Sequence, residues 1–245
     1  MKKDSGNYIV EVENLTKKFG SFIAVDNISF KVKKGEIFGF LGANGAGKTT
    51  AMKMLTGLLN PSSGKAIVAG WNVETNPDKV KLNIGYMSQK FSLYDDLRVN
   101  ENIRLYAGIY GLKRSEIKIK INKLIGELGM ENLRKKLVGD LPLGWKQKLA
   151  FAISLVHEPP VVFLDEPTSG VDPITRRQFW EMIYKASSEG TTIFVTTHYL
   201  DEAEYCTRAS IMVDGQIKAL DTPENLKNRF EVDNMQEVFV KLARG

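Results

Sequence analysis

The run from Gly42 to Thr49, GANGAGKT, has the residue types that hold a phosphate group. Glycines let backbone N–H groups turn towards an anion, the N-terminus of a following helix adds partial positive charge, and Lys48 adds a full one. The hydroxyl of Thr49 can bind Mg²⁺. The residues expected around the phosphates are Gly42, Ala43, Asn44, Gly45, Ala46, Gly47, Lys48, Thr49 and Thr50. One alternative is a glycine-rich turn that only connects two elements, and another is the dinucleotide-binding glycine pattern, which leaves Lys48 unexplained.

Two carboxylates follow an apolar run further along the chain. The segment VVFLDE places Asp165 and Glu166 directly after Val161–Leu164. A carboxylate at a strand end can hold the hydration shell of Mg²⁺, and a second one can polarise a water molecule for attack on a γ-phosphate. We assign Asp165 to the metal and Glu166 to catalysis. Two acidic residues after a strand are more often a solvated loop, but the phosphate cradle earlier in the chain favours the catalytic interpretation.

These side chains need strands and helices to position them. The segments YIVEVE, FIAVDNISFKV and EIFGFLG are predicted to be strands, and the continuous apolar run of the third indicates a buried central strand. From Gly47 to Leu59 the apolar residues recur at helical spacing, and this pattern stops at Asn60-Pro61. The cradle therefore lies between a buried strand and a helix, which is the context that a phosphate-binding loop needs.

The rest of the chain alternates between helical and strand patterns. Apolar positions from Val99 to Tyr110 predict one helix, and Ser115 is expected to cap a second one. Further predictions are a strand at 161–164, a helix from about 173 to 187, a strand at 192–196 and a hairpin around Asp214-Gly215. This alternation predicts an α/β fold with a mostly parallel sheet covered on both faces.

Composition is compatible with one large α/β domain of 245 residues. Lys and Arg number 34 against 29 Asp and Glu, and this small surplus suits a phosphate ligand, an anionic membrane surface or an ordinary solvated exterior. Cys206 is the single cysteine and no leader-like segment opens the sequence, so a reducing cytosolic setting is expected. The apolar runs are far shorter than the roughly 20 residues that span a bilayer, so any membrane role is expected to come through a partner.

With these motifs in this order, the sequence resembles the nucleotide-binding domain of ATP-binding cassette (ABC) transporters over almost its whole length. The resemblance implies a P-loop NTPase fold, in which a RecA-like, mostly parallel core sheet is joined by an N-terminal antiparallel β subdomain and an inserted α-helical subdomain. It places the β subdomain and Walker A core at 1–90, the helical subdomain at 91–156, the Walker B, D-loop and switch core at 157–220 and C-terminal helices at 221–245. The ligands that it implies are ATP and Mg²⁺.

Other landmarks of the family follow from the same resemblance. Phe19 in LTKKFG stands where an aromatic ring stacks on adenine, with a core aromatic as the alternative. Gln89 matches the Q-loop glutamine that reaches metal and water, and SGVD at 169–172 matches the D-loop that crosses to the partner subunit. His198 matches the switch histidine at the γ-phosphate, whereas His157 is interpreted as structural or surface. The implied catalytic set is Glu166, His198, Gln89 and Lys48, and the implied metal set is Thr49, Gln89 and Asp165.

The signature sequence departs from the family. Where the family has Leu-Ser-Gly-Gly-Gln, this chain has Leu141-Pro142-Leu143-Gly144-Trp145. Pro142 offers neither a hydroxyl nor an N–H group, but its fixed φ suits the first turn of a helix. The backbone N–H groups of Leu143, Gly144 and Trp145 are expected to face the phosphate of ATP held by the opposite subunit. Losing one uncharged donor costs on the order of 1 kcal/mol, which predicts weakened but retained coupling.

This variant signature, the segment DEPTSGVDP and the ending MQEVFVKLARG resemble the drug-export and ABC-2-type subfamily, which includes bacterial proteins with two such domains in tandem. The resemblance implies an ATPase that powers an exporter from the cytoplasmic face of the inner membrane, as a peripheral protein. The implied partners are a second nucleotide-binding domain, identical, tandem or different, and integral membrane subunits, with no nucleic acid. A candidate surface for the membrane partner comprises Phe91, Leu93, Tyr94 and Leu97, which could instead pack inside the helical insertion.

Two other functions compete with the transporter ATPase. A soluble ABC ATPase of translation or DNA repair would need tandem linked domains or long coiled-coil insertions, neither of which this sequence contains. A regulatory partner domain could hold ATP and turn it over weakly because of the altered signature. Intact Glu166 and His198 argue against that third function.

Overall fold

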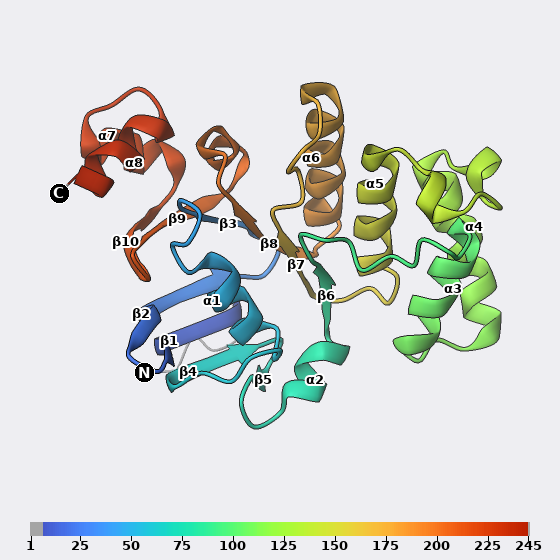
Figure 1. Cartoon of the computed structure of the whole chain (residues 1–245), viewed down its shortest axis with the longest axis horizontal. Coiled ribbons are helices and arrows are strands. Elements are labelled where there is room, and N and C mark those ends of the chain that lie inside the picture. Colours follow the sequence, from blue (N-terminus) through green and yellow to red (C-terminus); the bar gives the residue numbers. More distant parts are fainter. Residues whose placement is uncertain (1–6, 245) are drawn as a thin grey trace.

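Two β-sheets stacked on either side of helix α1 organise the N-terminal and central parts of the computed structural model, which describes residues 7–244 (Figure 1). The first sheet is antiparallel with the order β2-β1-β4-β5. Its strands are β1 (Tyr8–Phe19), β2 (Phe22–Lys33), β4 (Ser63–Val68) and β5 (Trp71–Asn72). This sheet is the predicted antiparallel β subdomain.

The second sheet has six strands in the order β10-β9-β3-β8-β7-β6. All of its pairings are parallel except β10 with β9. Its strands are β3 (Ile37–Leu41), β6 (Ile84–Met87), β7 (Val161–Asp165), β8 (Thr192–Thr197), β9 (Arg208–Val213) and β10 (Gln216–Asp221). The carboxyl ends of β3, β7 and β8 therefore lie at one edge of the sheet, where ligands of open α/β sheets bind.

Both faces of the central sheet are buried. Phe38, Phe163 and Phe194 point to the side of α1 (Lys48–Leu55), where they share a core with the first sheet. The alternate residues pack on the other face against α5 (Leu143–Ser154) and α6 (Pro173–Ser188). Such double coverage explains the continuous apolar runs of these strands and confirms the predicted, mostly parallel sheet.

Helix α1 is shorter than predicted, because it ends at Leu55 and not at Leu59. Gly57 has a φ of 69°, in the left-handed region that glycine adopts without strain. The N–H groups of Leu58 and Leu59 both donate to the carbonyl of Lys53 (2.9 and 3.0 Å), which closes the helix end.

The inserted helices pack around a core of their own. These are α3 (Val99–Ile109), α4 (Arg114–Leu128) and one face of α5, while the short α2 (Pro77–Leu82) lies beside β5 and β6. The prediction that Ser115 caps α4 is wrong, because Ser115 lies inside the first turn of the helix. The cap is made by Glu116, whose Oε2 accepts a hydrogen bond of 2.7 Å from the N–H of Lys113.

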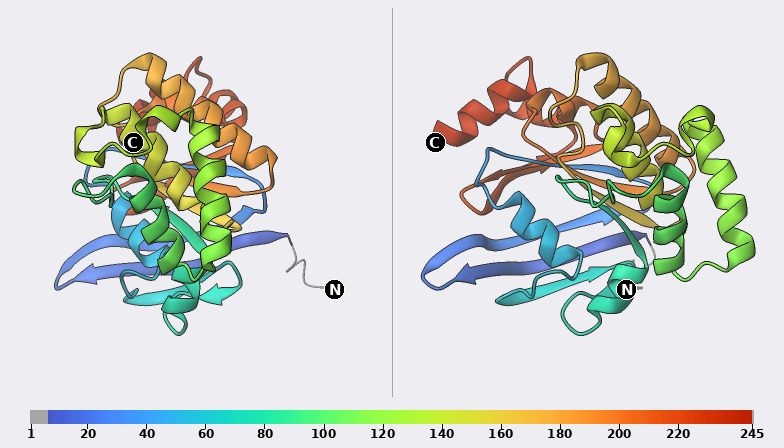
Figure 2. Two further views of the ribbon diagram at one scale, coloured as in Figure 1. Left: turned by 90° about the vertical axis from the view of Figure 1, so that its right-hand side faces the viewer. Right: turned by 45° about the vertical axis from the view of Figure 1, so that its right-hand side comes forward.

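Two C-terminal helices, α7 (Pro223–Phe230) and α8 (Met235–Arg244), lie at the opposite end of the molecule from α3 and α4 (Figures 1 and 2). They pack on β9 and on the 3₁₀ segment η3 (Leu200–Tyr205), where Leu226, Met235 and Val238 are buried. Among residues 7–244, no helix is both long enough and apolar enough to cross a membrane.

Candidate functional site

The loop between β3 and α1 is held tightly by its neighbours. A Cβ atom on Gly42 would lie 2.4 Å from the carbonyl oxygen of Met212, and one on Gly47 would lie 2.3 Å from that of Ala24. Gly47 also has a φ of 100°, and Gly45 has a φ of 83° with open space around it. Two of these glycines are therefore needed for close backbone packing, and Gly45 is needed for its backbone conformation alone.

Lys48 places a buried cation at this loop. Its side chain is 4% exposed, and Nζ donates to the carbonyls of Gly42 (2.8 Å) and Ala43 (3.1 Å). Nζ also lies 3.7 Å from Oε1 of Glu166. Burial lowers the pKa of Lys48, while the neighbouring carboxylates raise it. The predicted phosphate cradle thus contains a desolvated ammonium group that is bonded to the carbonyl groups of its own loop.

Asp165, the last residue of β7, is 3% exposed and lies directly opposite Thr196 of β8. Its Oδ1 accepts hydrogen bonds from the hydroxyls of Thr196 (2.7 Å) and Thr49 (3.4 Å). Burial raises the pKa of Asp165 above its ordinary value, and these hydrogen bonds partly offset that rise. The structure therefore brings together the two predicted metal ligands, Thr49 and Asp165, from α1 and β7.

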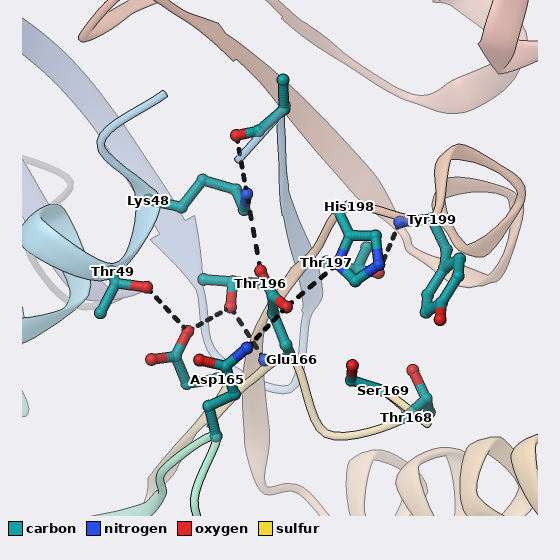
Figure 3. A network of polar contacts seen from close by, with 12 residues as sticks. Lys48, Thr49, Asp165, Glu166, Thr168, Ser169, Thr196, Thr197, His198 and Tyr199 are labelled. Carbon is teal, nitrogen blue, oxygen red and sulfur yellow. Dashed lines mark hydrogen bonds and ion pairs between the residues drawn. The ribbon is translucent and has the colours of Figure 1, made fainter. Parts of the chain in front are cut away.

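Glu166 has a φ of 47°, an uncommon conformation for a residue other than glycine. Its N–H donates to both the carbonyl and the hydroxyl of Thr196, each at 3.1 Å. Its Oε2 accepts from Nε2 of Gln89 (3.1 Å) and lies 3.0 Å from Nδ1 of His198 (Figure 3). Gln89 and His198, two predicted catalytic residues that are distant in sequence, therefore both contact the carboxylate of a third, Glu166.

Thr196 is a site residue that sequence reasoning missed. It binds both Asp165 and the backbone of Glu166, and it is fully buried. A possible signal was the threonine pair that ends the apolar segment TIFVTT, since buried hydroxyl groups need hydrogen-bond partners.

Phe19 lies at the end of β1 and is 50% exposed, so the alternative of a core aromatic is wrong. Its cross-strand partner is Phe22, which is 63% exposed and was not predicted as a site residue. Two positions further, Ala24 packs against Gly47. An exposed aromatic pair therefore stands on the strand that borders the glycine loop.

The altered signature begins α5, with Pro142 as the N-cap at ψ 151°. Pro142 lies just outside the helix, and its fixed φ leads directly into the first turn. The N–H of Trp145 donates to the carbonyl of Pro142 at 3.0 Å. Leu143 and Gly144 are the first two helical residues, whose N–H groups have no partner within a helix. A cavity of about 390 Å³ is lined by these residues together with Gly170 and Asp172.

The SGVD segment leads into α6. Asp172 caps this helix by accepting hydrogen bonds from the N–H groups of Ile174 and Thr175, both at 3.0 Å. Its pKa is lowered, chiefly by the hydroxyl of Thr175 at 2.6 Å. Within residues 7–244, no recorded hydrogen bond or ion pair joins residues 142–145 or 170–172 to Lys48, Thr49 or Glu166.

The remaining predicted positions are structural in character. His157 stacks on Tyr110 with 3.6 Å between ring centroids, and its Nε2 lies 3.1 Å from the carbonyl oxygen of Ile84. Burial lowers the pKa of His157 to about 4. In the candidate partner surface, only Tyr94 is largely exposed, at 49%. Its companions Phe91 and Leu93 are half-buried against the cores, so these residues form no continuous exposed apolar patch.

The family described as ABC transporter matches residues 25–169, which include the glycine loop, Gln89 and both carboxylates. The probable multidrug ABC transporter ATP-binding protein YbhF of Escherichia coli is 47% identical over 97% of this chain and 42% of its own length. The human phospholipid-transporting ATPase ABCA3 is 40% identical over 91% of this chain and 13% of its own length. The chain thus spans less than half the length of these relatives.

Solved structures agree with the sequence comparison. A structure described as the ATP-binding subunit of an ABC transporter superimposes with a TM-score of 0.86 and 28% identity, over 96% of this chain and 99% of that one. CbiO1 from Clostridium perfringens, part of an ABC transporter complex, gives a TM-score of 0.83 and 30% identity, over 96% and 94% of the two chains. The antiparallel sheet, the mostly parallel sheet and the inserted helices are therefore those of a P-loop NTPase of this kind.

Proposed function

Because this chain belongs to the ABC transporter family, we propose that it binds ATP with Mg²⁺ and hydrolyses it to power a membrane transporter. The observation that carries the proposal is the meeting of Gln89, Glu166 and His198 beside the buried ammonium of Lys48. A phosphate-binding loop next to a carboxylate that two polar side chains orient is suited to water attack on a phosphate.

Each residue has a distinct part in this chemistry. The N–H groups of the loop from 42 to 50 and the N-terminus of α1 bind phosphate oxygens, and Lys48 neutralises their charge. Glu166 polarises the attacking water, while Gln89 and His198 fix the orientation of its carboxylate and contact the γ-phosphate. Phe19 stacks on the adenine ring.

The residues at the end of β7 fit a magnesium ion. The hydroxyl oxygen of Thr49 lies 3.4 Å from Oδ1 of Asp165, and oxygen is the ligand atom that Mg²⁺ prefers. Within residues 7–244, no group of three His, Cys, Asp or Glu side chains forms a complete cage. That agrees with Mg²⁺, which is usually held by one or two carboxylates together with phosphates and water. When bound, it would neutralise charge on the phosphates. By the family resemblance Gln89 would be a further ligand, and its side chain lies beside Glu166, the residue that follows Asp165.

The partner half of the site is provided by another copy or a related domain. Leu143 and Gly144 are the first two residues of α5, so their N–H groups have no acceptor within the helix and can donate to a nucleotide held by a partner. In the proposed complex, two domains close head to tail on two ATP molecules, and closure moves integral membrane subunits. By similarity to YbhF, the transporter is a multidrug-type exporter, with this domain peripheral at the cytoplasmic face of the inner membrane.

Nucleotide binding is tested with Lys48→Ala and a matched control, Lys53→Ala. Both lysines lie on α1, but Lys53 is exposed in its last turn. We expect Lys48→Ala to weaken ATP binding at least about tenfold, because a charge-assisted contact to phosphate is worth roughly 1.5–3 kcal/mol. Lys53→Ala should bind like the wild type, as measured by titration with a fluorescent ATP analogue. Equal affinity in all three proteins would contradict the proposed cradle.

The transport role is tested by purifying the tagged protein from native membranes and identifying what accompanies it. A multi-spanning membrane protein, retained in mild detergent, is the expected partner. Recovery of only ribosomes or DNA would contradict the transport role while leaving the ATPase proposal intact.

A further inference from the structure

A buried carboxylate outside the site described above connects the two loops that carry Glu166 and His198. Glu202, in η3, is completely buried, and its Oε1 accepts a hydrogen bond of 2.6 Å from the hydroxyl of Thr168. Thr168 is also completely buried and follows Glu166 by two residues. One hydrogen bond therefore ties the turn after the catalytic carboxylate to the segment that follows the histidine.

Arg176 of α6 adds a second link between the same parts. Its Nε lies 3.7 Å from Oε1 of Glu202, and its guanidinium carbon lies 4.1 Å from the centroid of the Tyr199 ring. Tyr199 directly follows His198, and Figure 3 shows both beside the turn that carries Thr168. A guanidinium at this distance from an aromatic face is attractive. Arg176 therefore contacts the segment that follows His198, residues 199–205 (the switch segment), at both Tyr199 and Glu202.

This network is assembled but not fully closed. Oε2 of Glu202 and Nε of Arg176 have no hydrogen-bond partner among the described residues. A separation of 3.7 Å is an ion pair but is too long for a hydrogen bond. Because unsatisfied buried polar groups disfavour a conformation, a shift of less than about 1 Å that closed this contact would be favourable. The contact between α6 and η3 can therefore tighten without any other rearrangement of these two side chains.

The same turn is held from its other side by the helix that begins with the signature. Gln147 of α5 is completely buried, and its Nε2 lies at hydrogen-bond distance, 3.5 Å, from the carbonyl oxygen of Ser169. Residues 167–172 therefore lie between α5 and η3, with a polar contact to each. If α5 moved, these two contacts would transmit the movement through residues 167–172 to η3.

We propose that Glu202, acting through Thr168 and Arg176, is a positioning residue that holds His198 against Glu166 and couples its position to the turn at 167–172. This inference rests on the proposed ATPase function. Glu202 does not touch the glycine loop, so its loss should reduce the turnover rate and leave ATP affinity nearly unchanged.

Thr168→Val tests the proposal by removing the hydroxyl at similar side-chain volume. We expect kcat of the 245-residue chain to fall about tenfold, which corresponds to about 1.4 kcal/mol of transition-state stabilisation, with KM for ATP within about twofold. Thr168→Ser keeps the hydroxyl and should recover most of the rate. Thr168→Val combined with Glu202→Gln should be no slower than the slower single variant, because both break one contact.

Two further variants control for destabilisation. Ser154→Ala removes an equally buried hydroxyl that bonds only within α5 (to the Phe151 carbonyl, 2.7 Å), and it should leave kcat unchanged. Arg176→Lys, at a partly exposed position, keeps the charge but loses flat stacking on Tyr199, and it should lower kcat in the same direction as Thr168→Val.

Amide hydrogen exchange gives a readout that does not depend on activity. In Thr168→Val, residues 199–205 should exchange faster than in the wild type, while β7 stays protected. The proposal is overturned if exchange at 199–205 is unchanged, if Thr168→Ser is as slow as Thr168→Val, or if kcat is unaffected. A wild-type chain without ATPase activity would instead contradict the proposed function, and the exchange experiment would still decide whether the contact holds the switch segment.

Discussion

At the scale of single residues, the free chain holds a carboxylate where it is poorly solvated. Asp165 is 3% exposed, and burial raises its pKa above the ordinary 3.8. An acid with a raised folded-state pKa favours folding below its unfolded pKa, and that contribution is lost as the pH rises through the folded value. At neutral pH the ionised Asp165 therefore costs stability, which a bound cation would offset.

We predict that Asp165→Asn raises the melting temperature of the nucleotide-free chain at pH 7. The gain should shrink as the pH falls towards 4, because the Asp165 carboxyl of the folded wild type then becomes protonated and no longer carries a buried charge. ATP with Mg²⁺ should stabilise the wild type but not the variant, as measured by thermal unfolding at several pH values. A variant that melts below the wild type at pH 7 would contradict this account of the buried charge.

Motif spacing predicted the residues with a fixed chemical task, and it missed those whose role depends on a distant partner. Lys48 and Glu166 could be found because the glycines and the end of an apolar run mark their positions, and His198 because it matches the switch histidine of the family. The roles of Thr196 and Thr168 arise from contacts across strands and loops. Thr196 lies beside Asp165 only because β7 and β8 pair in one particular register, which local sequence does not specify.

At the scale of elements, the glycine loop is specified by its packing as well as by its ligand. A side chain at Gly47 would overlap the carbonyl of Ala24, whereas one at Gly45 would enter open space. The two positions share a left-handed backbone conformation. They therefore form a natural comparison between conformational strain alone and strain combined with a clash.

We predict that Gly45→Ala destabilises the chain by about 1–2 kcal/mol, the usual cost of the left-handed conformation for other residues. Gly47→Ala should cost clearly more, because β2 or the loop must also move. Urea unfolding of both variants measures the difference. Equal losses of stability would show that the loop relaxes freely and that its packing on β2 is unimportant.

The start of α5 offers a second prediction at this scale. Pro142→Ser introduces a hydroxyl at the N-cap, where serine is favoured by about 1 kcal/mol and where the family has its signature serine. We expect faster ATP hydrolysis and stronger ATP-dependent dimerisation, measured by a coupled assay and by light scattering. No change in either quantity would contradict the assignment of residues 142–144 to a partner's nucleotide.

Element types were easier to predict than element ends. The pattern over 99–110 gave α3 almost to the residue, since its apolar stripe faces one core. The end of α1 and the start of α4 were misplaced, because Gly57 and the Glu116 cap decide them locally against the longer periodic pattern. The sequence could not decide whether Pro142 is the N-cap or the first helical residue, since its φ suits both positions.

At the scale of the whole molecule, the fold class followed from the alternation of strands and helices, and the comparisons confirm it. The placement of α7 and α8 on η3 could not be predicted, because it depends on tertiary packing of side chains such as Leu226 and Val238 in one core with Ala203. In the proposed function, the chain provides one set of catalytic groups at the sheet edge and a separate signature surface on α5. That division is what a head-to-tail pair of domains requires.

The most direct test of the central claim is the steady-state ATPase rate of the wild type beside Glu166→Gln, with Glu189→Gln, an exposed carboxylate on the far end of α6, as the control. The account predicts at least about a hundredfold loss of rate in Glu166→Gln, the usual contribution of a positioned general base, with ATP binding retained and the control unaffected. Equal rates in the wild type and Glu166→Gln, or no hydrolysis in either, would contradict it.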